Sequence, residues 1–249
     1  MKQILLTKTE ILKLQEILNP FINRTRLGKI RAYNNFKDNE KATHAFLEII
    51  NISVCPYCNI NYIYTTECNK KGIVKYIGRP DFDHFVPKSK KSTLAMSCTN
   101  LVPSCQICNE KIKRNKPFSR KTHLHPYFDD FDSIKYFDLN LLQSNYSNKE
   151  NFEIIFQTRK NVNQNDANRA DENIKDLLLL ERYKYHKEEI VFLFKRISRY
   201  SNIKKLSSIH SLVNGTSYMI KDCFPERFCE INETSLGKLK KDILEKYVK

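Results

Sequence analysis

The sequence predicts an α+β fold in which a cysteine-rich centre lies between two mainly helical ends. Apolar residues recur at helical spacing before position 50 and again after position 166. Between them, short apolar runs bounded by turn residues are typical of strands, and two CxxC pairs mark the region over 55–108. We therefore expect three parts: an N-terminal helical segment over 1–50, a metal-bound domain over 51–128 and a mainly α-helical accessory domain over 129–249.

Two helices are expected in the N-terminal segment. Apolar residues from Ile11 to Leu18 predict a first helix that ends at Pro20, because proline cannot donate an intrahelical hydrogen bond. The next apolar run at helical spacing predicts a second helix over 42–49. A basic loop over 23–31 is expected to join the two helices.

The central region predicts a strand, a long loop, a second strand and a helix, with a separate pair of short strands ahead of this unit. The first strand of the unit is expected to end at Pro87. This arrangement places polar side chains at a strand end and at a helix start. The expected bounds are 62–65 and 74–77 for the separate pair, 81–86 and 101–104 for the two strands of the unit, and 106–113 for its helix.

The C-terminal part is expected to begin with a β pair and to continue as helices. The predicted strands span 136–142 and 152–158 around a polar turn. Apolar spacing then predicts one helix that carries residues 174–181, a second that carries 190–197, and a final amphipathic helix over 236–247 capped by Thr234-Ser235.

The cysteine spacing predicts a structural zinc site. Two CxxC knuckles supply four thiolates, the usual ligands of a closed tetrahedral zinc site: Cys55, Cys58, Cys105 and Cys108. Metal-binding pairs of this kind indicate a reducing compartment, and neither an apolar leader nor a long apolar run is evident. We therefore expect a cytoplasmic protein without a membrane partner. The alternative is that these cysteines are buried free thiols.

A second group of residues suits catalysis. Asp83 and Asn109 offer hard oxygen donors of the kind that Mg²⁺ prefers, and His84 offers a base with an ordinary pKa near neutrality. Because Asp83 and His84 are neighbours on a predicted strand, their side chains should point to opposite sides. One short segment is therefore expected to contain both a structural metal and a catalytic one.

The charge balance favours a polyanionic partner. There are 43 Lys and Arg residues against 28 Asp and Glu, a net charge of +15, and phosphate neutralisation supplies most non-specific affinity for nucleic acids. A generally lysine-rich proteome would give the same excess. The residues best placed for phosphate are Lys88, Lys113, Arg114 and Lys116, although a solvated surface role stays open for each of them.

The pattern CPYC, DFDHFVPKS, NLVPSCQICN and a following KPF resembles the HNH, or ββα-metal, nucleases of the four-cysteine type. It is similar to phage endonuclease VII and to HNH proteins of bacterial anti-phage defence loci. The match covers about residues 50–128, a third of the chain. The run over 236–243 also resembles a tail found in some such bacterial proteins.

The resemblance implies a role for each matching residue. Asp83 would bind the catalytic Mg²⁺ or Mn²⁺, and His84 would face the scissile phosphate as the general base. Asn109 stands where the family often has histidine, a departure that endonuclease VII shares, and would be the second metal ligand. Asn100 occupies the family's middle position, where it would brace the long loop and orient His84.

The function expected from this resemblance is metal-dependent hydrolysis of DNA, leaving 5′-phosphate and 3′-hydroxyl ends, as an effector of anti-phage defence. The alternative is a catalytically inactive, zinc-dependent module that binds nucleic acid. The helical C-terminal half could in addition dock onto a partner, for example an ATPase encoded nearby. A homo-oligomer would suit cleavage of both strands, because one active site nicks one strand at a time.

Overall fold

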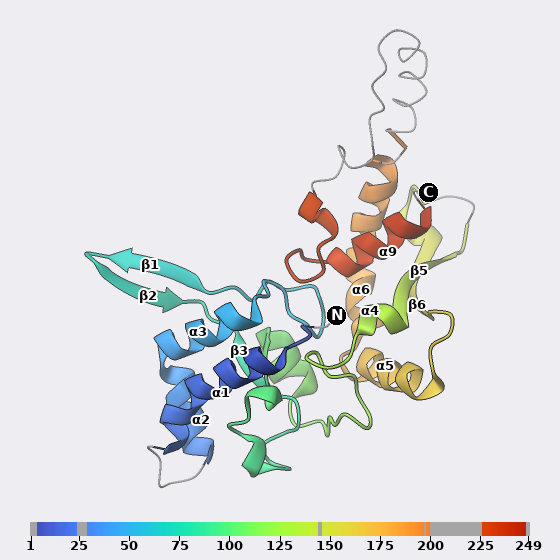
Figure 1. The fold of residues 1–249 in the computed structure, drawn as a ribbon. Coiled ribbons are helices and arrows are strands. Elements are labelled where there is room, and N and C mark those ends of the chain that lie inside the picture. The colour runs from blue at the N-terminus through green and yellow to red at the C-terminus, as the bar shows by residue number, and fades with distance from the viewer. Residues whose placement is uncertain (1–3, 24–28, 144–145, 197, 200–225, 248–249) are drawn as a thin grey trace.

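The computed structural model describes residues 4–23, 29–143, 146–196, 198–199 and 226–247 (Figure 1). Helices and small antiparallel sheets alternate along the chain, so the predicted α+β class is confirmed. One apolar core contains buried residues from all three predicted parts, including Phe36, Phe82 and Ile243. The cysteine-rich centre is therefore packed against both ends of the chain.

Three helices form the N-terminal part: α1 (Lys8–Asn23), α2 (Lys29–Asp38) and α3 (Glu40–Ile50). Helix α1 continues through Pro20, so the predicted end at that proline is wrong. Helix α2 begins inside the predicted loop over 23–31, of which residues 24–28 lie outside the described part of the chain. It forms because its apolar residues Ala32, Tyr33 and Phe36 share one buried face between charged neighbours.

Each of the three sheets has two antiparallel strands. They pair β1 (Thr66–Lys70) with β2 (Ile73–Ile77), β3 (Asp81–His84) with β4 (Leu101–Ser104), and β5 (Lys135–Leu141) with β6 (Phe152–Thr158). The hairpin β1–β2 projects away from the rest of the described chain (Figure 1).

The strand predicted over 62–65 begins instead at Thr66. Residues 62 and 63 bond to the chain just before the first cysteine knuckle: Tyr62 forms a bridge with Val54, and the N–H of Ile63 donates to the carbonyl of Ser53. Ile63 is also buried in the core. Apolar composition alone did not reveal that this segment pairs with the knuckle and not with β2.

The predicted unit of strand, loop, strand and helix is present in the centre. In the register of β3 and β4, Asp83 lies opposite Val102 and His84 opposite Leu101. The helix η3 (Ile107–Lys113) is a π-helix, a form that often occurs at functional sites. Its wide turn places Cys108 and Lys113 on the same buried side.

The C-terminal part contains α4 (Phe131–Ile134), α5 (Gln164–Asp176), α6 (Leu179–Tyr183), a helical segment over 187–196 and α9 (Gly237–Tyr247). The helix predicted through 174–181 is broken, because Leu178 has the left-handed backbone conformation with φ of 52°. Ile197, predicted on the next helix, lies outside the described residues. None of the helices in the described part of the chain has the length and apolar composition of a membrane span.

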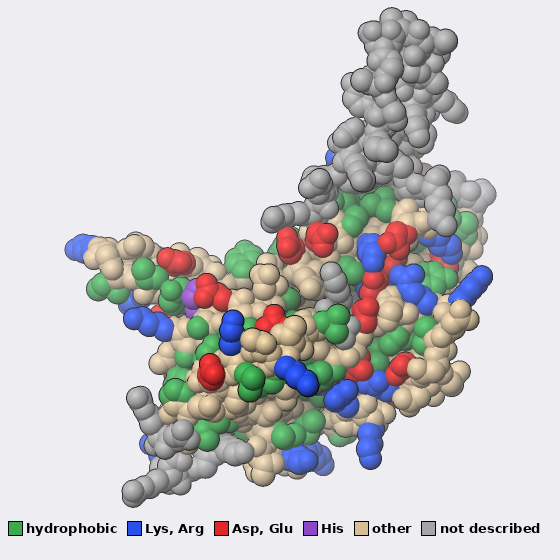
Figure 2. All heavy atoms as spheres, viewed as in Figure 1, with side chains coloured by type: hydrophobic (Ala, Val, Ile, Leu, Met, Phe, Trp, Pro, Cys, Tyr) green, Lys and Arg blue, Asp and Glu red, His purple; other side chains and the backbone are tan. Residues whose placement is uncertain are grey.

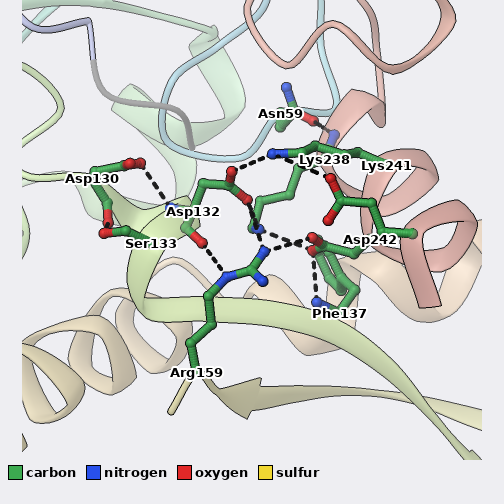
Figure 3. Close-up of polar contacts among 10 residues, drawn as sticks. Asn59, Asp130, Asp132, Ser133, Phe137, Arg159, Lys238, Lys241 and Asp242 are labelled. Carbon is green, nitrogen blue, oxygen red and sulfur yellow. Dashed lines mark hydrogen bonds and ion pairs between the residues drawn. The ribbon is translucent and has the colours of Figure 1, made fainter. Parts of the chain in front are cut away.

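A network of buried charges joins α9 to β5 and α4 (Figure 3). The ammonium of Lys238 is fully buried and lies 2.5 Å from Asp132 and 2.9 Å from Asp242. Asp242 also accepts the N–H of Phe137, and Arg159 reaches both carboxylates. Burial alone would raise the pKa of Asp132, but the two neighbouring lysine ammonium groups outweigh it and keep that pKa below its ordinary value.

The start of α9 is attached to the first cysteine knuckle. The side chain of Asn59 accepts the N–H of Lys238, and its main-chain carbonyl accepts the N–H of Leu236. Ser235, predicted as part of a local cap, donates its hydroxyl to the carbonyl of Ile60. Gly237 allows the start of α9 to pack closely against the segment that precedes it, because a Cβ there would lie 2.6 Å from the carbonyl oxygen of Glu230.

On the face drawn in Figure 2, Lys and Arg side chains are interspersed with acidic and apolar ones. The net charge of +15 therefore does not gather into a single basic patch on that face. Surface charge of this kind supports association with polyanions in general and does not by itself define a binding surface.

Candidate metal centre

The four predicted zinc ligands lie together. The sulfur atoms of Cys55, Cys58, Cys105 and Cys108 are all within 4.8 Å of one another, and all four residues are buried. Thiolates about 2.3 Å from a tetrahedral zinc ion lie about 3.8 Å apart, and the Sγ atoms of Cys58 and Cys105 are 3.9 Å apart. The donor set and its spacing therefore fit a zinc ion with no open coordination position.

Neighbouring N–H groups point at these sulfur atoms. The side-chain amide of Asn61 donates to Cys105, and the guanidinium of Arg182 donates to Cys108 at 3.1 Å. Four thiolates around one zinc ion carry a net charge of −2, so a nearby cation and N–H donors stabilise the site. Arg182 comes from α6, and the adjacent Tyr183 donates its hydroxyl to the carbonyl of Cys58. The C-terminal part thus supports the metal centre directly.

Asn100 forms hydrogen bonds across the long loop between β3 and β4, where the resemblance implies a bracing residue. Its side-chain oxygen accepts the N–H of Val86, and its side-chain nitrogen donates to the carbonyls of Val86 and Leu94. Its own carbonyl accepts the N–H of Phe85. These bonds connect the start of the loop with its far side, next to His84.

His84 lies at the end of β3 under the ring of Tyr33. The two ring centroids are 4.5 Å apart, and His84 is 8 % exposed. Its Nε2 is 3.1 Å from the carbonyl oxygen of Ala95. A carbonyl only accepts, so Nε2 carries the hydrogen and Nδ1 carries the lone pair. Burial, together with smaller contributions from the charges of Lys88 and Lys113, lowers the pKa of His84 to about 4, so the ring is neutral at neutral pH.

Asp83 faces away from His84, as strand alternation predicts, but its carboxylate is already engaged. The ammonium of Lys113 is 3.0 Å from both carboxylate oxygens, and the hydroxyl of Tyr57 donates to Oδ2 at 2.6 Å. Lys113 also donates to the carbonyl of His84. Asp83 is 2 % exposed and Lys113 is fully buried. The ammonium of Lys113 therefore occupies the position beside both oxygens of Asp83 that a metal ion would need. This arrangement does not fit the predicted role of Asp83 as a metal ligand.

Asn109 lies against Asp81 and not against Asp83. Its side-chain nitrogen donates to Asp81 Oδ2 at 3.2 Å. Asp81 and Asp83 occupy alternate positions of β3 and therefore share one face, which η3 covers. Asn109 thus lies on the expected face of β3, but its partner there is Asp81, a carboxylate that the sequence did not mark as a candidate ligand.

The predicted phosphate-binding residues differ in their surroundings. Lys113 is buried in the ion pair with Asp83 and does not reach the surface. Arg114 is exposed, with φ of 49° where η3 ends. Lys116 contacts Asp176, and the ammonium of Lys88 lies 5.0 Å from the ring centroid of Tyr33, beside the site of His84.

A second group of potential ligands lies on α5 and in the segment between η3 and α4. Donor atoms of His123, Glu172 and Asp176 are within 4.8 Å of one another. Each carboxylate already has a lysine partner, Lys175 for Glu172 and Lys116 for Asp176. The imidazole of His123 bonds to Asp176. This group is therefore satisfied as an ion-pair network.

Sequence reasoning missed several residues that shape the centre. Arg182 has no sequence pattern that relates it to the cysteines, and Tyr57, although it lies inside the first CxxC pair, has none that relates it to Asp83. Asp81 had a usable signal, because the run DFDH places two carboxylates at a period of two on a strand. No protein-family model, curated protein or solved structure matches this chain. The likeness to HNH nucleases therefore rests on the chain's own residues.

Proposed function

We propose that this protein is a zinc-stapled endonuclease of the HNH type that hydrolyses phosphodiester bonds of DNA with a divalent cation. The observation that carries the proposal is the position of His84. It ends β3, its tautomer is set by the carbonyl of Ala95, and the loop around it is braced by Asn100. A neutral imidazole with a defined lone pair is what a general base requires.

His84 would accept the proton of the attacking water on Nδ1, while Nε2 keeps its bond to Ala95. Its low pKa keeps the imidazole in the accepting form at neutral pH. Lys88, beside the same ring, would contact a phosphate oxygen. The zinc does no chemistry in this scheme, because four thiolates leave no place for water. Bound Mg²⁺ or Mn²⁺ would supply charge stabilisation at the scissile phosphate.

One observation favours the alternative of a zinc-dependent nucleic-acid-binding module without catalysis. The ring of Tyr33 covers His84, which has little contact with solvent. Cleavage requires that a water molecule and a phosphate reach Nδ1, so substrate binding would have to expose the imidazole ring. Binding without cleavage requires no such movement, and the assay below separates the two functions.

The test is cleavage by the full-length, zinc-loaded protein of supercoiled plasmid, linear duplex, branched DNA, single-stranded DNA and structured RNA. We expect nicking of DNA with Mg²⁺ or Mn²⁺, and none after EDTA removes the added cation, because the phosphate charge then lacks its counterion. Products should carry 5′-phosphates, which a ligase can reseal. Binding to DNA with no cleavage under any cation would favour the inactive module, and cleavage of RNA alone would change the proposed substrate.

A further inference from the structure

Two pairs of side chains connect β3 with η3. Asp83 pairs with Lys113, and Asp81 pairs with Asn109. Asp81 precedes Asp83 by two residues on the strand, and Asn109 precedes Lys113 by four residues on the helix. The two carboxylates differ in charge balance. Asp83 has a lysine ammonium against both oxygens, whereas Asp81 has no ion-pair partner among the described residues and contacts a neutral amide.

Ser104 adds an oxygen atom to the same face. It lies directly opposite Asp81 in the register of β3 and β4, and directly opposed residues of an antiparallel pair place their side chains on one face. Its hydroxyl is fully buried and has no hydrogen-bond partner in the described part of the chain. An unsatisfied buried hydroxyl is unfavourable, so a cation that binds its oxygen would stabilise the site.

Asp81 is also accessible from outside. It lines an open pocket of about 380 Å³ between α3 and β2, together with Glu40, Tyr76 and Arg79. A hydrated cation could enter by this pocket and keep several of its water molecules, as Mg²⁺ usually does in proteins. Asp83 has no such access, because it is buried under Tyr57 and Lys113.

We infer that Asp81, Asn109 and Ser104 form the binding site for a hard divalent cation, Mg²⁺ or Mn²⁺, in place of Asp83. The three side chains offer a carboxylate, an amide and a hydroxyl oxygen, the donor types that these ions prefer. Rotation of the Asn109 amide would turn its oxygen toward the ion. Asp83 then has a structural role as the partner of Lys113. The binding of this cation does not rest on the proposed function. Its catalytic use does, and it requires a substrate that reaches from the Asp81 face of β3 to His84 on the opposite face.

The test is Mn²⁺ binding by the zinc-loaded full-length protein, measured without nucleic acid from the electron paramagnetic resonance signal of free Mn²⁺. We expect one Mn²⁺ per chain beyond the zinc. Asp81→Asn should weaken binding by more than about tenfold, with the melting temperature unchanged, because asparagine still accepts the bond from Asn109. Ser104→Ala should weaken it less. The matched control is Glu67→Gln, an exposed site on β1, which should bind as the wild type does.

Two results would overturn the inference: no Mn²⁺ bound by the wild type, or an Asp81→Asn variant that binds Mn²⁺ with unchanged affinity. A folded Asp83→Asn variant that retains Mn²⁺ binding would support the inference. If Asp83→Asn loses Mn²⁺ binding and Asp81→Asn keeps it, Asp83 is the metal ligand. The proposed function fails separately. If Mn²⁺ binds as expected and no DNA is cleaved, only the nuclease proposal is lost.

Discussion

Cys108→Ser is expected to abolish the folded state of this protein. The variant loses one of four buried thiolates, and serine is a poor ligand for zinc. Structural zinc contributes about 10–16 kcal/mol in small zinc-binding peptides, while whole domains are stable by only about 5–15 kcal/mol. The loss should also release Arg182, which donates to the Cys108 sulfur. We expect a protein without zinc that is insoluble or lacks a cooperative melting transition.

The matched control is Cys98→Ser. Cys98 is as buried as the cysteines of the cluster but is not part of it, since its thiol contacts the carbonyl of Ile11. It should keep one zinc ion per chain and lose little stability. Zinc content by mass spectrometry and melting by circular dichroism measure both variants. A wild-type protein without zinc, together with an unchanged melting curve for Cys108→Ser, would show that the cluster is four free thiols.

Lys238→Met is expected to destabilise the protein by up to about 3–5 kcal/mol, because it removes the buried cation that Asp132 and Asp242 share and leaves the fully buried Asp242 only its contact with Arg159. The ammonium of Lys238 is fully buried between Asp132 and Asp242 (Figure 3). Methionine preserves most of the side-chain volume, so the decrease in the free energy of unfolding measures the loss of the charge and not a loss of packing. Urea unfolding gives the free energy directly. Lys240→Met, on the same helix and outside the network, should change it by less than about 1 kcal/mol.

The double variant Lys238→Met/Asp242→Asn separates the contribution of the Lys238–Asp242 ion pair from that of the hydrogen bond between Phe137 and residue 242. Asparagine can still accept the N–H of Phe137 that Asp242 now accepts, and neither buried charge is left alone. We expect the double variant to be more stable than Lys238→Met, giving a coupling energy of about 1–3 kcal/mol. Additive losses would mean that Lys238 and Asp242 do not stabilise each other.

Local patterns predicted the parts of the fold that depend on neighbouring residues. The CxxC spacing located the cysteine cluster, and short apolar runs located β3, β4, β5 and β6 to within a residue or two. The predicted opposition of Asp83 and His84 follows from strand geometry alone. Asn100 was assigned its bracing role by resemblance, and its three side-chain bonds agree with that role.

Contacts between distant segments could not be predicted. Lys113 was expected at the surface because it follows the knuckle in a basic run, but a π-turn directs it to Asp83, thirty residues away. Lys238 belongs to a run that resembles a family tail. Only the fold shows that the carboxylate of Asp132 pairs with its ammonium and so stabilises the buried charge. The partners of Asp81 likewise depend on how η3 lies across β3. Such pairs have no local sequence pattern.

The most direct test of the account is the cleavage rate of His84→Ala at matched zinc content. We expect plasmid nicking with Mg²⁺ to fall by at least about 100-fold, since a positioned general base contributes about 10²–10⁴-fold. Added imidazole should restore part of the rate by entering the space left beneath Tyr33. Zinc content should stay at one ion per chain. Nicking at the wild-type rate by the zinc-loaded variant would contradict the assignment of His84 as the base.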